Sequence, residues 1–104
     1  MTDGSSEFEV LVREFLEAHP TLRHEWKTQH SWLFGPTREV TILPSSPEVP
    51  EVWASESGAQ IAVGVGDEHT DFEDFGRGLT DAQVAQEALN HFAELLHEHG
   101  YLDA

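Results

Sequence analysis

The chain has 104 residues, with 20 Asp and Glu against 5 Lys and Arg, no Cys and 38% apolar residues, so we expect one domain with one core over residues 1–104. The net charge of -15 makes phosphate backbones and anionic membranes poor partners, because binding either one requires a cationic surface. The lack of cysteine excludes a disulfide framework, a thiolate nucleophile and a Cys-ligated zinc site.

An amphipathic helix is predicted near the N-terminus. Apolar residues from Phe8 to Leu16 recur at i, i+3, i+4, i+7 and i+8, which places them on one face of a helix. Ser6 and Glu9 fit an S-x-x-E capping box at the start of this helix. Pro20 prevents the helix from continuing, because proline removes a backbone donor and clashes with the preceding turn.

Strands are predicted in the middle of the chain, where the apolar period changes from 3.6 to 2. Three or four strands fit the pattern. They are Trp26–Trp32, Val40–Leu43, Val52–Ser55 and Ala59–Val65. The short connections between them favour an antiparallel meander. The second face of the last segment is nearly bare of side chains around Ala62 and Gly64, which permits close approach by a helix or another backbone.

No segment is suited to a membrane or to export. The longest apolar stretch, Ile61–Val65, is interrupted by Gly64 and is far shorter than the ~20 residues of a membrane helix. The start of the chain, Met1–Gly4, carries neither a cationic nor an apolar signal region. We therefore expect a cytoplasmic protein.

The acidic residues are concentrated in the second two thirds of the chain. Residues 1–38 carry four cations against six acids, whereas residues 39–104 carry Arg77 against fourteen acids. The densest run, Asp67–Asp74, holds five carboxylates in eight residues. Carboxylates this close repel one another, which makes the run a candidate binding site. A solvated face, or the general acidity of a salt-loving host's proteins, would give the same composition.

A second helix is predicted before the C-terminus, and it completes the fold class. Thr80 and Gln83 form a T-x-x-Q capping box, and a continuous apolar stripe runs from Val84 to Leu96. Gly100 fits the C′ position that ends a helix. The sequence therefore predicts a two-layer α+β domain with an N-terminal helix, an antiparallel sheet of three to four strands and a C-terminal helix.

Motifs for catalysis or metal binding are absent from the sequence. There is no H-E-x-x-H and no G-x-S-x-G, and a calcium-loop register that begins at Asp71 lacks the acid that would close the site. The acid run also lacks a Lys or Arg that would stabilise a developing anion. We expect no enzymatic activity, no catalytic residue and no cofactor. A metal site built from His69 and neighbouring carboxylates stays open.

A cationic protein is the class of partner that the acid surface favours. Charge complementarity accelerates association and selects partners, and affinity then needs apolar anchors inside the charged rim. For each aromatic near the acid run, a place in the core is the competing interpretation. The predicted partner-binding residues are Trp53, Asp67, Glu68, His69, Asp71, Phe72, Glu73 and Asp74.

The run Ile61–Phe72 also resembles a known class of protein. It is a strand that leads into Gly-Asp-x-His-x-x-Phe at Gly66–Phe72, and a C-terminal helix follows. This order resembles small bacterial immunity proteins of polymorphic toxin systems. Such proteins bind their toxin in the cytoplasm and block its active site without catalysis of their own. The resemblance implies a non-enzymatic inhibitor and transfers no contact residue to this chain.

Together these observations predict an acidic, non-enzymatic inhibitor that binds a basic protein, as an immunity protein neutralises a basic toxin. Two alternatives stay open. A DNA mimic that inhibits a DNA-binding protein would space its carboxylates along an extended face. A small carboxylate- or metal-dependent hydrolase would place His69 and two carboxylates in a deep cleft.

Overall fold

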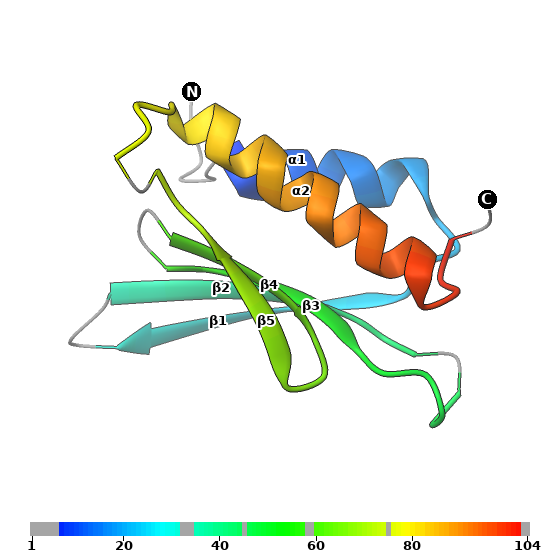
Figure 1. Cartoon of the computed structure of the whole chain (residues 1–104). Helices are drawn as coiled ribbons and strands as arrows, with labels where there is room; N and C mark the ends of the chain where they lie inside the picture. The colour runs from blue at the N-terminus through cyan, green and yellow to red at the C-terminus, as the bar shows by residue number, and fades with distance from the viewer. Residues whose placement is uncertain (1–6, 32–34, 45, 58–59, 75, 103–104) are drawn as a thin grey trace.

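The computed structural model describes residues 7–31, 35–44, 46–57, 60–74 and 76–102. In chain order, the elements are α1 (Glu7–Ala18), β1 (His24–Ser31), β2 (Gly35–Ile42), β3 (Val52–Ser57), β4 (Gln60–Val65), β5 (Glu68–Phe72) and α2 (Asp81–Glu98). The predicted α+β class is confirmed, because both helices lie on the same face of an antiparallel sheet (Figure 1). Three residues with predicted roles, Ser6, Trp32 and Ala59, lie outside the described residues.

The sheet has five strands where the sequence predicts three or four. Its order is β1-β2-β3-β4-β5, and each strand pairs antiparallel with the next, so the predicted meander is correct. The additional strand is β5, which lies inside the acid run. It pairs with β4 from Val65↔Glu68 to Ile61↔Phe72. Its sequence, Glu-His-Thr-Asp-Phe, has no apolar alternation, so its backbone pairing could not be predicted from side-chain periodicity.

The core lies between the sheet and the two helices. Alternate residues of the central strands face the helix layer, as the side-chain period of 2 requires. The buried strand residues on this face are Val40, Ile42, Val52, Ala54, Ile61 and Val63. The helices contribute Val12 and Leu16 from α1 and Phe92 and Leu96 from α2, each at most 6% exposed. Burial of one such side chain stabilises the fold by about 1.5 to 3 kcal/mol, so this layer supplies most of the folding energy.

Both predicted ends of α2 are confirmed. The Gln83 backbone N–H donates to Thr80 Oγ1 at 3.1 Å, and the Thr80 N–H donates to Gln83 Oε1 at 2.8 Å, which completes the capping box. At the other end, Gly100 has a φ of 81°. The Tyr101 N–H then donates to the Leu96 carbonyl at 2.8 Å, which satisfies an end carbonyl of the helix.

An ion-pair cluster joins α1 to the sheet. Glu9 on α1 is only 4% exposed. Its carboxylate accepts hydrogen bonds from Arg13 Nε at 2.8 Å and from Nη1 of Arg38 on β2. The Arg13 guanidinium in turn lies over the ring of Trp26 on β1, 4.4 Å from its centroid. A buried carboxylate is costly unless it is paired, so these contacts fix the position of α1 over β1 and β2.

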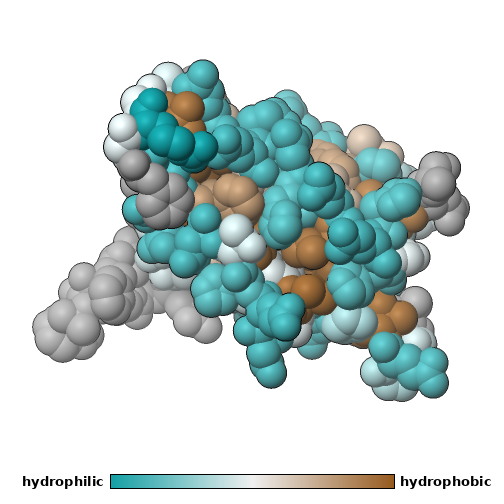
Figure 2. Space-filling model, in the orientation of Figure 1, coloured by the Kyte–Doolittle hydropathy of each residue, from teal (hydrophilic) through white to brown (hydrophobic). Residues whose placement is uncertain are grey.

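The view from the β5 side shows a hydrophilic surface over most of α2 and β5, with smaller apolar patches between them (Figure 2). Val10 on α1 is the large apolar side chain that is most open to solvent among the described residues, at 43% exposure. Neither described helix is long and apolar enough to cross a membrane.

Candidate functional site

Three of the predicted partner-binding residues come together on the face of the sheet that carries no described helix, which we call the open face. Trp53 on β3 pairs in register with Gly64 on β4, and Gly64 pairs with His69 on β5. These residues therefore form one row across three strands. Asp71 shares the open face with His69, because it lies two residues further along β5.

The indole of Trp53 is held in a fixed position on the open face. Its Nε1–H donates to the Gly66 carbonyl at 3.0 Å. The ring centroid lies 5.9 Å from that of the His69 imidazole, at an angle of 43°. Trp53 is half-buried and is not part of the core cluster. A large aromatic side chain is thus fixed outside the core of the domain.

Gly64 creates the space that this indole occupies. A Cβ at position 64 would come within 2.7 Å of Trp53 Cζ2 and 2.8 Å of His69 Cβ, both too close for real atoms. The bare face of β4, which the sequence predicts would permit close approach by a helix or another backbone, admits the Trp53 indole and also the backbone of β5, because the same Cβ would meet the Glu68 carbonyl oxygen. Gly64 is therefore a positioning residue for the aromatic row.

Carboxylates lie beside the aromatic row. His69 Nε2 lies 3.5 Å from Asp71 Oδ1, and these side chains are 47% and 43% exposed. Glu39 on β2 shares this face, and the register places only the small residues Ser55 and Ala62 between it and Asp71. Three strand spacings separate the two acids, or about 14 Å. Glu39 is not among the residues predicted from the sequence. Its place next to the apolar Val40, at the start of a predicted strand, was the available signal that its side chain points to the opposite face.

Other members of the acid run point elsewhere. Glu68 and Phe72 alternate with His69 and Asp71, so they point to the side of the sheet that faces the helices. Phe72 is partly buried against the core, with its ring centroid 5.5 Å from that of His91 on α2. Phe72 thus contributes to packing. Asp67 is exposed in the turn between β4 and β5.

The last two acids of the run organise the loop that leads to α2. Asp74 Oδ1 accepts a hydrogen bond from the Leu79 backbone N–H, and the Asp74 carbonyl accepts one from the Arg77 N–H at 3.0 Å. The Glu73 carbonyl accepts a further bond from Arg77 Nη2 at 3.2 Å. Asp74 therefore has a structural role in addition to its charge.

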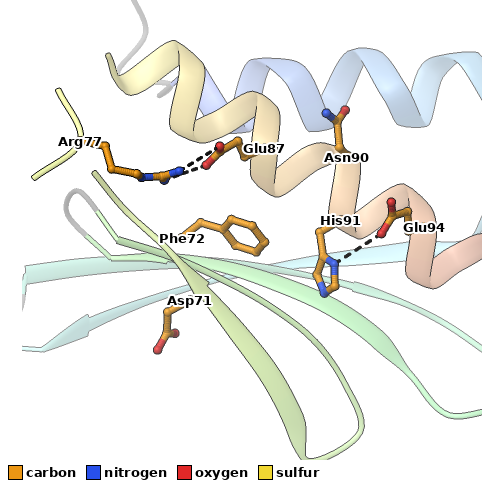
Figure 3. A pocket seen from close by; sticks show the side chains of 7 residues that line it. All are labelled: Asp71, Phe72, Arg77, Glu87, Asn90, His91 and Glu94. Carbon is orange, nitrogen blue, oxygen red and sulfur yellow. Dashed lines mark hydrogen bonds and ion pairs between the residues drawn. The ribbon is translucent and has the colours of Figure 1, made fainter. Parts of the chain in front are cut away.

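A hollow of about 510 Å³ lies between β5 and α2 (Figure 3). In this hollow the Arg77 guanidinium donates two hydrogen bonds to the Glu87 carboxylate, at 2.9 and 3.2 Å. The hydrogen bond to Glu87 raises the pKa of Arg77 above its ordinary value. The histidine in this hollow is His91, and the Asp71 carboxylate points away from it in Figure 3. Within the described ranges, no three His, Asp or Glu side chains are grouped as metal ligands would be.

Most of the cationic groups are already engaged inside the domain. The paired ones are Arg13, Arg38 and Arg77. Arg23 and Lys27 are exposed. With a net charge of -15, the surface offers carboxylates with few cations among them, and its field favours a cationic partner.

Comparison of the chain with protein-family models, curated proteins and solved structures gives no match. The function is therefore inferred from the charges and geometry of the site.

Proposed function

We propose that this protein is an acidic, non-enzymatic inhibitor that acts in the cytoplasm and binds a cationic protein through the open face of its sheet, as an immunity protein binds a basic toxin. The observation that carries this proposal is the indole of Trp53, which is fixed by the Gly66 carbonyl on a sheet face without a described helix. Carboxylates of Glu39 and Asp71 share that face.

Electrostatics favours the encounter. The chain has 20 acids and 5 cations, and three of the cations are paired within the domain. Such a charge attracts a cationic partner and accelerates association by roughly 10- to 1,000-fold at low salt. Such charges select the partner more than they supply affinity. Affinity therefore requires an apolar contact near the acids.

Trp53 is suited to that contact. Tryptophan is enriched among residues that dominate binding energy, and a rigid side chain loses little conformational entropy on binding. Its indole also attracts a guanidinium or ammonium group, and this domain already uses that geometry where Arg13 lies 4.4 Å from the Trp26 ring. An arginine of the partner on Trp53 would have the Asp71 carboxylate close by, across His69, for a charge-assisted hydrogen bond.

The proposal is tested by affinity capture from the lysate of the source organism at low and high salt, followed by titration of the captured protein. Trp53→Ala and Asp71→Asn alter the open face. Val10→Ala and Glu14→Gln are the matched controls, because they remove an exposed apolar group and a charge from α1 on the opposite side.

We expect a basic protein that the parent retains at low salt and releases at high salt. Trp53→Ala should weaken its binding at least about 30-fold, the effect of losing about 2 kcal/mol at a dominant contact. Asp71→Asn should weaken it less, and both α1 controls should bind normally. Equal binding by Trp53→Ala and Val10→Ala would contradict the proposal, as would a captured protein that is acidic.

A further inference from the structure

β5 forms one margin of the sheet. It is the last strand in the order β1 to β5, and among the described elements its partners are β4 on one side and α2 above it. Figure 1 shows β5 at the near margin, with no strand beyond it. Its residues from Glu68 to Asp71 are all exposed. The outer side of β5 is therefore open to solvent.

The hairpin geometry determines which backbone groups face outwards. The pair Val65↔Glu68 leaves a turn of two residues between β4 and β5. In such a hairpin the residues that flank the turn are a hydrogen-bonded pair, and bonded and non-bonded pairs then alternate. Glu68 and Thr70 therefore bond to β4, while the N–H and C=O groups of His69 and Asp71 point outwards. These groups form a template for one more strand.

The charges along β5 restrict what can be added there. Asp71 lies on the open face and Glu68 on the opposite one, so carboxylates flank the outer edge on both sides. A second copy of β5 would bring like charges opposite one another, which destabilises a strand pair. A basic segment would bring opposite charges together.

We propose that β5 binds an extended basic segment of the partner protein as a sixth strand of the sheet. Main-chain hydrogen bonds to His69 and Asp71 would supply affinity, and cationic side chains at neighbouring positions of the segment would lie beside Asp71 on one face and beside Glu68 on the other. This inference rests on the proposed function, since it specifies how the cationic partner engages the domain.

Two peptides of identical charge test the inference. Both have roughly ten residues that repeat Arg-Arg-Thr-Thr, which places arginine on both faces of an added strand. The second peptide is N-methylated at both odd and even positions, so that neither of its edges can pair with a strand. The affinity of each peptide is measured by fluorescence anisotropy. Amide hydrogen exchange of the protein is followed by NMR with and without peptide. His69→Pro removes an outward N–H and leaves the pairing with β4 intact, and His69→Ala is its matched control.

We expect the unmodified peptide to bind at least about tenfold more tightly than the methylated one. It should slow exchange at His69 and Asp71 and leave Thr70 unchanged, because the Thr70 amide is already bonded to β4. His69→Pro should bind the unmodified peptide more weakly than His69→Ala. Equal binding of both peptides would overturn the edge-strand inference and leave the cationic partner in place. Binding of neither peptide would also overturn it, and the capture of a basic protein would then decide the proposed function separately.

Discussion

Replacement of Gly64 by alanine should release the indole of Trp53 and destabilise the domain. The added Cβ would lie 2.3 Å from the Glu68 carbonyl oxygen, 2.7 Å from Trp53 Cζ2 and 2.8 Å from His69 Cβ. Because one of these atoms belongs to the backbone, the β4–β5 pairing must shift as well as the indole. Overpacking of this kind costs about 1 to 3 kcal/mol.

This loss of stability is partly offset by an effect of alanine on the unfolded chain. Alanine restricts the unfolded chain and restores about 0.4 to 1 kcal/mol where its backbone conformation is allowed, so the net loss for Gly64→Ala should be about 1.3 kcal/mol from the middle of each range. For a domain of this size, Tm should fall by roughly 5 to 10 °C. Urea denaturation followed by far-ultraviolet circular dichroism measures the free energy of unfolding, and the near-ultraviolet tryptophan band reports the indole.

Two further variants separate the contact with the indole from backbone strain as causes of the lost stability. Gly66→Ala meets no atom within 4 Å, but its φ of 58° disfavours alanine, so it should cost about 1 to 2 kcal/mol from backbone strain alone. In a Trp53→Ala background, Gly64→Ala should cost less than in the parent, because the indole contact is gone while the Glu68 contact remains. A Gly64→Ala variant as stable as the parent, with an unchanged tryptophan band, would refute the described packing of the indole.

Three other predictions follow from the fold. Glu9→Ala should lower the free energy of unfolding by about 2 to 3 kcal/mol, because it leaves the Arg38 guanidinium without its buried carboxylate; a loss as small as that of an exposed acid would be inconsistent with the ion-pair cluster. Thr80→Ala should cost about 1 kcal/mol through loss of the α2 cap, whereas Thr80→Ser should restore most of it in the same urea assay. Burial, and then the charge of Glu51, raise the pKa of Tyr101 above its ordinary 10.0, so the folded state favours the neutral phenol and stability should fall as pH rises above about 10. An ultraviolet titration should place the Tyr101 pKa lower in Glu51→Gln than in the parent, and a higher value would contradict the stated cause.

The sequence predicts both helices because their caps and apolar stripes are local. Thr80 and Gln83 specify the start of α2 through contacts only three residues apart. The sequence does not predict β5, because the pairing of β5 depends on the β4 backbone and not on its own side chains. The sequence predicts Glu9 only as a capping residue, because its partner Arg38 is 29 positions away on β2. Pairing over such a distance has no signal in the periodicity of a single chain.

The candidate site, too, could be predicted from the sequence only in part. Trp53, His69 and Asp71 are among the predicted partner-binding residues, and the strand register brings them onto one face. The sequence predicts that the acid run contributes five carboxylates to partner binding, and the period of 2 in β5 places two of them, Glu68 and Asp71, on opposite faces of the sheet. Whether an acid faces a partner is therefore decided by whether the run forms a strand, which composition alone does not reveal.

Salt should act with opposite signs on folding and on partner binding. The domain measures 36 × 31 × 28 Å, so at 0.01 M salt, where the screening length is about 30 Å, nearly all of its carboxylates repel one another. At about 0.5 M the screening length falls below about 10 Å and most of this repulsion is lost. Tm of the free protein should therefore rise by several degrees across this range, while affinity for a cationic partner should fall. Thermal unfolding and titration in the same sodium chloride series measure both effects. A Tm that falls with added salt would mean that attractive pairs such as Arg77–Glu87 outweigh the repulsion, and affinity that does not depend on salt would remove charge as the basis of recognition.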